Sequence, residues 1–315
     1  MRAPRPVTRA RARQRGVAIV TALLLTTLAI TIVASLFWQQ QVQVRSIENQ
    51  RLQLQKQWVL RGALDWARLI LREDAKYSAT DDLNEPWAVP LSETRLDRYV
   101  ESAALRGDAG SAVLSGGIQD AQARLNLTNL ATQGNINQAE VQSFERLLTT
   151  LRQDPGIARA TAQQLADSER AAITDNPGSP HPIGFLQVDD LLAVPACTPQ
   201  VLNAIRDYVI FLPVATPVNA NTATPEVLAA RLPGLSVSDA TALANSRKQA
   251  GFRDLADLAA RLPGKPASVD PSLFSVASGH FLVNGRVTIR SATLQVQALV
   301  EREGAATHLL WQREI

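Results

Sequence analysis

The longest uninterrupted apolar stretch of the chain lies near its N-terminus. Residues 17–38, VAIVTALLLTTLAITIVASLFW, contain no charged side chain. As an α-helix that rises about 1.5 Å per residue, this segment spans roughly 33 Å, which matches the ~30 Å hydrocarbon thickness of a bilayer. The pattern therefore predicts a membrane-spanning helix.

The helical period continues after this segment, although the sequence becomes polar. Apolar residues recur at helical spacing in two adjacent rows: Leu54, Trp58, Trp66 and Ile70, and beside them Val59, Ala63, Ala67 and Leu71. This spacing places an apolar stripe on one helix face. We predict one helix from residue 17 to about residue 74, whose second half packs on a sheet. Acids, Asn and Pro between residues 76 and 90 predict a loop.

Two regions alternate between apolar and polar residues as β-strands do. In residues 112–130, AVLSGGIQDAQARLNLTNL, the pattern predicts two short strands around a turn at Gly116-Gly117. Residues 276–315 predict a second set of strands with a turn at Glu303-Gly304. Strands of this kind, packed over the apolar stripe, predict an antiparallel sheet and an α+β body.

The region between these strands is rich in Ala, Leu and Gln and predicts a mostly α-helical domain inserted into the body. A short phrase recurs in it three times, at residues 190–205, 226–243 and 257–264. Each copy resembles a helix-hairpin-helix unit. Before the second copy, Thr224 is placed to cap a helix that opens with Pro225.

Charge is distributed unevenly along the chain. The first 16 residues carry six Arg and no acid, which leaves 26 basic and 29 acidic side chains in the rest. A basic segment before an apolar helix predicts an N-terminus in the cytoplasm and a body on the opposite side of the membrane. A cleaved secretory signal is disfavoured because the apolar run is too long, and a plain uncleaved anchor does not account for Gly16.

Composition argues against several functional classes. With one Cys and three His, the chain lacks a disulfide framework and a cysteine-rich zinc site, and it contains no G-x-S-x-G, H-E-x-x-H, P-loop or dinucleotide motif. We therefore expect no enzymatic activity. Cys197 is expected to be a small buried residue. A nucleic-acid-binding hairpin at Gly234-Leu235-Ser236 remains an alternative, although the nearest cations, Arg231 and the pair Arg247-Lys248, are few.

The junction Gly16-Val17 resembles a type III, prepilin-type signal, which is cut on the cytoplasmic side after the Gly. Most pilin-like proteins carry Glu at the fifth position after the cut, but this chain has Thr21 there, and no acid occurs between Val17 and Arg45. The segment GGIQDAQARLNLTNL at residues 116–130 is similar to the corresponding segment of K-type minor pseudopilins of type II secretion systems. Thr in place of the Glu is also typical of that family.

This resemblance implies a pilin-like long N-terminal helix packed on a small antiparallel sheet, with a large inserted all-α, helix-hairpin-helix or SAM-like domain. It implies prepilin-peptidase cleavage after Gly16, N-methylation of Val17, and an assembly role for Thr21. The expected segments are residues 1–16 as leader, 17–38 as transmembrane segment, 39–75 as continuation of the helix, 76–130 as first part of the body, 131–275 as helical domain, and 276–315 as C-terminal strands.

The expected function is that of a minor pseudopilin at the pseudopilus tip, which helps to initiate fibre assembly for the export of folded proteins. The expected partners are the I-type and J-type minor pseudopilins, the major pseudopilin, the prepilin peptidase and the bacterial inner membrane, with the body in the periplasm. The alternative is a membrane-anchored, helix-hairpin-helix DNA-binding protein of a competence-like system.

No cofactor and no metal ligand are expected from the residues themselves. Some K-type pseudopilins bind calcium in an acidic loop of the helical domain, and such sites need six to eight oxygen ligands. The corresponding region here lacks a dense acidic run, so the resemblance assigns no ligand. Its acids are Asp167, Glu169, Asp175, Asp189 and Asp190.

Overall fold

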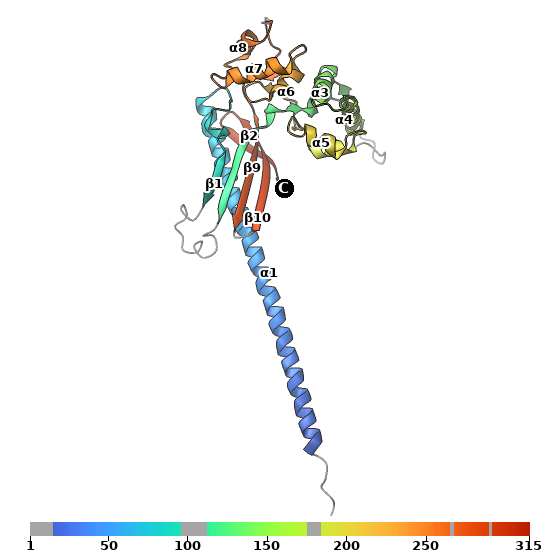
Figure 1. Ribbon diagram of the computed structural model, residues 1–315, viewed down its shortest axis with the longest axis vertical. Coiled ribbons are helices and arrows are strands. Elements are labelled where there is room, and N and C mark those ends of the chain that lie inside the picture. The colour runs from blue at the N-terminus through green and yellow to red at the C-terminus, as the bar shows by residue number, and fades with distance from the viewer. Residues whose placement is uncertain (1–14, 96–111, 175–183, 265–267, 290–291) are drawn as a thin grey trace, which may run out of the picture. The chain divides into compact units, whose positions relative to one another are not determined.

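The structure is a computed structural model that describes residues 15–95, 112–174, 184–264, 268–289 and 292–315 (Figure 1). Most of the predicted leader, His181 and Asp175 lie outside these residues. The chain divides into two compact units, residues 1–58 and 59–315, and each is described by itself.

The described residues of the first unit form the N-terminal part of one helix, α1 (Arg15–Tyr77, 63 residues). Its apolar side chains from Val17 to Trp38 are exposed. An 18-residue window reaches a mean hydropathy of 2.5, and α1 is the one described helix that is long and apolar enough to cross a membrane. An apolar helix surface of this kind needs a lipid or protein environment.

The second unit contains a five-stranded antiparallel sheet in the order β1-β2-β9-β10-β11. Its strands are β1 (Leu91–Arg95), β2 (Val113–Asp120), β9 (His280–Ile289), β10 (Ala292–Glu303) and β11 (Ala306–Glu314). Because β2 pairs directly with β9, everything between Asp120 and His280 is an insertion between neighbouring strands. Figure 1 shows β1, β2, β9 and β10 side by side along α1. The turn predicted at Glu303-Gly304 joins β10 and β11 and is confirmed.

The apolar stripe of α1 was predicted only in part. The residues that pack on the sheet are Leu60, Leu64, Ala67 and Leu71, together with Trp87, Phe281 and Val300. Trp66 is 50% exposed and Trp58 is 68% exposed, so the row of tryptophans was wrongly placed in the core. The buried row follows i, i+4, i+7 and i+11 spacing, and Trp58 and Trp66 lie outside this row.

The predicted turn at Gly116-Gly117 is wrong, because both glycines lie inside β2. Gly116 pairs with Gly285 of β9 and with Leu91 of β1. A Cβ atom at Gly116 would lie 2.3 Å from the backbone oxygen of Asn284. Gly116 is therefore required by a close backbone approach between strands and not by a turn.

We predict that Gly116→Ala destabilises the protein by about 2 kcal/mol, since the added methyl group meets immobile backbone. Gly117→Ala is the matched control, because its Cβ would lie 3.6 Å from Pro90, an ordinary contact. Thermal unfolding of the detergent-solubilised full-length chain measures both. Equal unfolding midpoints for the two variants would contradict the steric explanation.

The inserted domain contains six α-helices in the described residues. They are α3 (Gln138–Thr150), α4 (Gly156–Thr174), α5 (Pro199–Ile205), α6 (Pro225–Arg231), α7 (Val237–Arg247) and α8 (Leu255–Arg261). Five of these helices begin after an N-cap residue whose side chain accepts a hydrogen bond from a backbone N–H of the first turn. These residues are Asn137, Thr198, Thr224, Ser236 and Asp254. These caps satisfy helical N–H groups that otherwise lack partners.

Short elements connect these helices to the body. The 3₁₀ helices are η1 (Pro86–Ala88), η4 (Ala121–Ala123), η5 (Leu127–Leu130) and η6 (Val188–Ala193). The two-residue strands are β3 (Leu125–Asn126), β4 (Ala131–Thr132), β5 (Asn135–Ile136), β6 (Val209–Ile210), β7 (Val218–Asn219) and β8 (Phe274–Ser275). The second half of the predicted hairpin, β3, pairs in parallel with β6 instead of with β2.

The helical domain has its own core, which includes Leu125, Leu127 and Leu130 and begins soon after Asp120. A smaller cluster joins it to the sheet face that does not contact α1. In this cluster Ile210 and Leu212 pack on Leu282 and Leu299. The sheet is thus covered on one face by α1 and, at one end of the other face, by the insertion.

Candidate functional site

The N-terminal end of α1 contains the predicted processing and assembly residues. Gly16 and Val17 lie in the first turn of α1. The Thr21 hydroxyl donates to the backbone oxygens of Val17 and Ala18, each at 3.0 Å. Position 21 carries a hydroxyl group in place of an acid. Because this hydroxyl is hydrogen-bonded within its own helix, Thr21 is compatible with a lipid environment. The roles of Gly16, Val17 and Thr21 stay predictions.

The junction between sheet and insertion is a buried polar network that the sequence analysis missed. The Asp120 carboxylate, at the end of β2, accepts hydrogen bonds from Asn219 Nδ2 (2.9 Å), Thr222 Oγ1 (2.5 Å) and Ser278 Oγ (2.6 Å). The backbone N–H of Gln122 also donates to it, at 2.8 Å. One carboxylate thus fixes the outgoing strand, the middle of the insertion and the returning segment.

Two asparagines of the GGIQDAQARLNLTNL segment extend this junction. Asn126 donates to Val214 O (2.8 Å) and accepts from Leu212 N (3.2 Å). Asn129 donates to Thr216 O (2.9 Å) and accepts from Thr216 N (3.1 Å). Each side-chain amide therefore forms the hydrogen bonds with the backbone of residues 212–216 that a neighbouring β-strand would otherwise form. This explains why polar residues occur between the buried leucines of the segment.

Burial raises the pKa of Asp120 to about 6, although hydrogen bonds from Ser278, Thr222 and the Gln122 N–H counteract the shift. A carboxyl group whose pKa is higher in the folded than in the unfolded protein stabilises the fold at low pH, and this contribution is lost as the pH rises through about 6. Acidification from pH 7 to pH 5 should therefore strengthen the junction.

We predict that Asp120 makes the folded state about 1 kcal/mol more stable at pH 5 than at pH 7. The measurement is urea unfolding of the full-length chain in detergent at both pH values. Asp120→Asn should remove this part of the pH dependence, because its amide does not titrate. An unchanged pH dependence in the variant would show that Asp120 keeps an ordinary pKa.

A second buried network ties α1 to the sheet through Arg302. Its guanidinium donates to Asp81 at 2.6 Å and to Asp74 at 2.9 Å, and it stacks over the Phe281 ring at 4.7 Å. Burial raises the pKa of Asp74 to about 6, aided by the nearby charge of Glu85. Carboxylate oxygens of Asp74, Asp81 and Glu85 lie within 4.8 Å of one another. The Arg302 guanidinium neutralises this cluster of carboxylates, so the arginine and the acids form an ion-pair network.

The acids considered for calcium do not converge. Asp167 pairs with Arg170 at 2.7 Å, and Glu169 accepts from the Gly134 N–H at 2.7 Å. Asp189 pairs with Arg206 at 2.8 Å, while Asp190 accepts from Leu186 N and Gln187 N. Since each described acid of the region has its own protein partner, these residues do not fit a shared calcium site with six to eight oxygens.

Both arginines of the hairpin are buried and are unsuited to bind phosphate. Arg231 is buried and pairs with Glu140 of α3, and Arg247 is buried and donates to Ala220 O and Ala223 O. Within the residues that the structure describes, only the second repeat has α-helices on both sides, α6 and α7. Its turn contains Gly234 at φ +84°. Of the three cations named for this hairpin only Lys248 is exposed, so the hairpin presents little of the positive charge that dominates nucleic-acid affinity.

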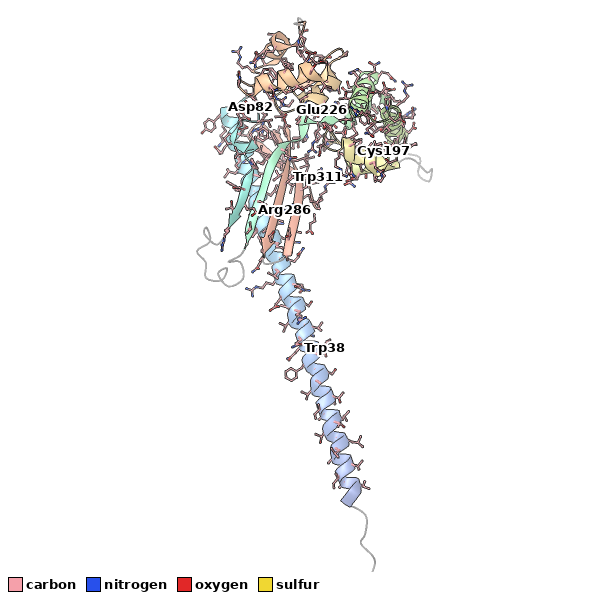
Figure 2. The ribbon with its side chains drawn as sticks, viewed as in Figure 1. Trp38, Asp82, Cys197, Glu226, Arg286 and Trp311 are labelled. Atoms are coloured by element: carbon pink, nitrogen blue, oxygen red, sulfur yellow. The ribbon has the colours of Figure 1, made fainter. Side chains whose placement is uncertain are left out.

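Cys197 lies in the core of the helical domain (Figure 2), and burial raises the pKa of its thiol. The expectation of a small buried residue is confirmed. A thiol with a raised pKa is a poor nucleophile.

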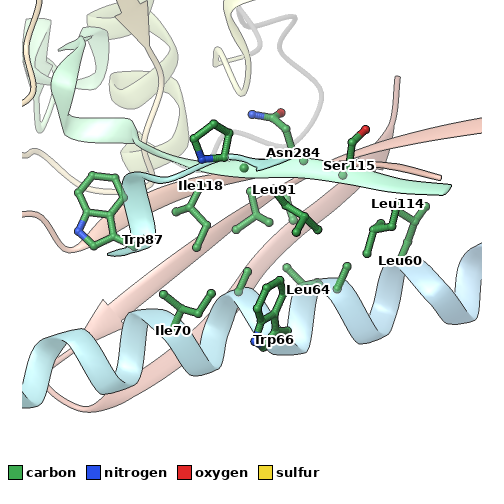
Figure 3. A pocket seen from close by; sticks show the side chains of 18 of the residues that line it. Leu60, Leu64, Trp66, Ile70, Trp87, Leu91, Leu114, Ser115, Ile118 and Asn284 are labelled. Carbon is green, nitrogen blue, oxygen red and sulfur yellow. The ribbon is translucent and has the colours of Figure 1, made fainter. Parts of the chain in front are cut away.

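An apolar groove of about 360 Å³ lies between α1 and the sheet (Figure 3). Leu64, Trp66 and Ile70 line one side, and Leu114 and Ile118 line the other. Figure 3 shows the polar side chains of Ser115 and Asn284 directed away from the helix. The groove offers no charged side chain for chemistry.

Taken together, an apolar anchoring helix, a sheet packed on its continuation and a large insertion between adjacent strands define a membrane-anchored, pilin-like subunit. Two family models match the chain, both described as type II secretion system protein K, over residues 123–214 and 218–277. The protein K of Pseudomonas aeruginosa is 26% identical over 304 residues, which cover 88% of this chain and 85% of that protein.

The fold has a solved counterpart in the crystal structure of the GspK-GspI-GspJ complex from the enterotoxigenic Escherichia coli type 2 secretion system. The match has a TM-score of 0.65 at 19% identity and covers 85% of this chain and 98% of that chain. It shows the same fold. The chain belongs to the protein K family of type II secretion systems and is a minor pseudopilin.

Proposed function

We propose that this chain is the tip subunit of a type II secretion pseudopilus and helps to start fibre assembly, without enzymatic activity. The observation that carries this proposal is position 21. Thr21 bonds back to its own helix and cannot offer a carboxylate to the N-terminal amine of a subunit above it. A subunit that cannot receive another one in this way suits the end of the fibre.

The inserted domain supports the same position. It leaves the sheet after β2 and returns at β9, and the networks around Asp120 and Arg302 fix it to the body. A bulky domain held in one orientation obstructs regular stacking within a fibre shaft but is tolerated at its tip.

We further propose that residues 1–16 form a leader cut after Gly16, that the amine of Val17 is methylated, and that the body lies in the periplasm with the anchor in the inner membrane. The six Arg of the leader favour a cytoplasmic N-terminus before processing. The E. coli relative was crystallised with GspI and GspJ. By analogy, the I-type and J-type minor pseudopilins are the proposed partners here, beside the major pseudopilin.

N-terminal mass spectrometry of the membrane-isolated protein, with and without the prepilin peptidase, tests the proposal. We expect a chain that starts at methylated Val17 only when the peptidase is present. A chain that starts at Met1 in both strains would indicate a plain anchor, and one that starts beyond Trp38 would indicate an exported body.

Thr21→Glu is predicted to leave folding intact but to misplace the subunit within the fibre, because it restores a carboxylate for the amine of a further subunit. Thr21→Gln is the control of similar shape without charge. Fibre initiation and tip position are measured by counting pseudopili and by immunogold labelling. If Thr21→Glu gave wild-type fibre initiation and tip position, the missing carboxylate at position 21 would not explain the place of the subunit at the tip.

A further inference from the structure

Three potential metal-ligating side chains stand in a row across neighbouring strands. His280 is the first residue of β9 and is opposite Glu301 of β10, and Glu301 is opposite His308 of β11. Directly opposed residues of an antiparallel pair point to the same face. This face is the one away from α1, because the adjacent residues Phe281 and Val300 pack against the helix.

His280 has an unusual environment. Its side chain is 7% exposed, and neither Nδ1 nor Nε2 has a hydrogen-bond partner. Its Nε2 lies 3.8 Å from Glu301 Oε1, which is too far for a hydrogen bond. Buried polar groups without partners are rare in folded proteins and often mark a missing ion or water.

The chemistry of the row fits a metal ion of intermediate softness. Neither ring nitrogen of His280 is engaged in a hydrogen bond, so a lone pair of the ring is free for a metal ion. Two imidazoles and one carboxylate form a common zinc ligand set with an open fourth position for water. Neighbouring strands lie about 4.8 Å apart, so His280 and His308 flank Glu301 at a separation that two imidazole side chains can bridge.

We propose that His280, Glu301 and His308 bind one zinc ion or a similar divalent transition-metal ion. The buried His280 and the half-buried Glu301 provide the fixed part of the site. Among the described residues, only Asp74, Asp81 and Glu85 have three such ligand atoms already within 4.8 Å of one another. Binding therefore requires the exposed ring of His308 to turn toward Glu301.

The site would link the three strands at the point where the chain returns from the insertion. Gly279, the residue before His280, donates its N–H to Gln122 Oε1 at 2.6 Å, and Gln122 in turn donates to Pro217 O at 3.1 Å. A bound ion would hold β9, β10 and β11 together beside this contact, and it would stiffen the attachment of the helical domain to the sheet.

The test uses the full-length chain in detergent, without a polyhistidine tag and after treatment with a chelator. Zinc is titrated by calorimetry, and cobalt absorption reports the ligand geometry. We expect one saturable site per chain and a higher thermal unfolding midpoint with zinc. Calcium should not compete, because this ligand set contains too few oxygens for it.

His308→Ala and Glu301→Gln alter side chains outside the core, so they test the site without disturbing the fold. Each should weaken zinc binding roughly ten- to hundredfold and abolish the thermal shift. His181→Ala is the matched control, since it removes the third His of the chain, and it should bind zinc as the wild type does. No saturable binding by the wild type, or undiminished binding by His308→Ala, would overturn the proposal.

Discussion

Arg302→Met is expected to cost about 3–5 kcal/mol of stability at neutral pH, a large part of the roughly 5–15 kcal/mol that holds a typical domain folded. Met keeps much of the apolar stem of Arg302 but lacks its guanidinium. Asp74 and Asp81 would then remain buried beside Glu85 without a cation. Since Asp74 comes from α1 and Arg302 from β10, the variant removes the ionic contact between helix and sheet.

The loss should depend on pH in a defined direction. Burial raises the pKa of Asp74 to about 6 even with Arg302 present, and removal of the cation raises it further. The Asp74 carboxyl group can therefore take up a proton at pH 5, which relieves part of the penalty. The variant should be closest to the wild type in acid and furthest from it at pH 7 and above.

Urea unfolding of the detergent-solubilised full-length chain at pH 5 and pH 7 measures this effect. Arg313→Met is the matched control, because Arg313 bonds Gln297 and Gln187 and stacks on Trp311 but pairs with no acid in the described part of the chain. Trp311 lies on β11 of the sheet (Figure 2). The control should change stability by about 0.5 kcal/mol or less. Similar losses for both variants would contradict a specific role of the buried ion pair.

Gly16→Val is expected to abolish leader cleavage and, with it, incorporation of the subunit into a fibre. A branched side chain at the last leader residue obstructs access of the peptidase to the scissile bond. The uncut chain keeps six Arg ahead of its membrane helix. Each Arg costs about 2.5–3.5 kcal/mol at the centre of a bilayer on insertion scales, so the helix cannot be drawn out of the membrane.

Ala18→Val is the control, because it introduces the same side chain two residues later, inside the helix. The two variants are compared by the mass of the membrane-isolated chain, by cross-linking to other pseudopilins and by secretion in a complemented deletion strain. We expect the control to be processed and functional. Normal processing of Gly16→Val would separate Gly16 from leader cleavage, although it would leave the fold and the family unaffected.

Local patterns predicted a substantial part of the fold. Apolar period and the absence of charge predicted the helix that is observed as α1, and alternation predicted the C-terminal strands. Capping chemistry located the start of α6 at Thr224 and Pro225. These features depend on neighbours a few residues apart, and such neighbours are visible in a linear sequence.

The errors arose where a residue meets a distant segment. Gly116-Gly117 has the composition of a turn, but it lies within β2 because Gly285 and Asn284, more than 160 residues away, approach it closely. The tryptophans match the helical period as well as the leucines do, yet Trp66 is half exposed, because the helical period alone does not specify which part of an apolar stripe the sheet covers.

By itself, the sequence determined the long apolar helix, the missing acid at position 21 and the C-terminal strands, and it predicted the cleavage junction, since each depends on residue type and short-range spacing. Only the tertiary structure decided which polar residues matter. Asp120 joins Ser278, Arg302 joins Asp74 and Asp81, and Arg231 is withdrawn from the surface by Glu140. A buried charge is stable only beside its partner, and here the partners are brought together by long-range strand pairing and packing that no local pattern records.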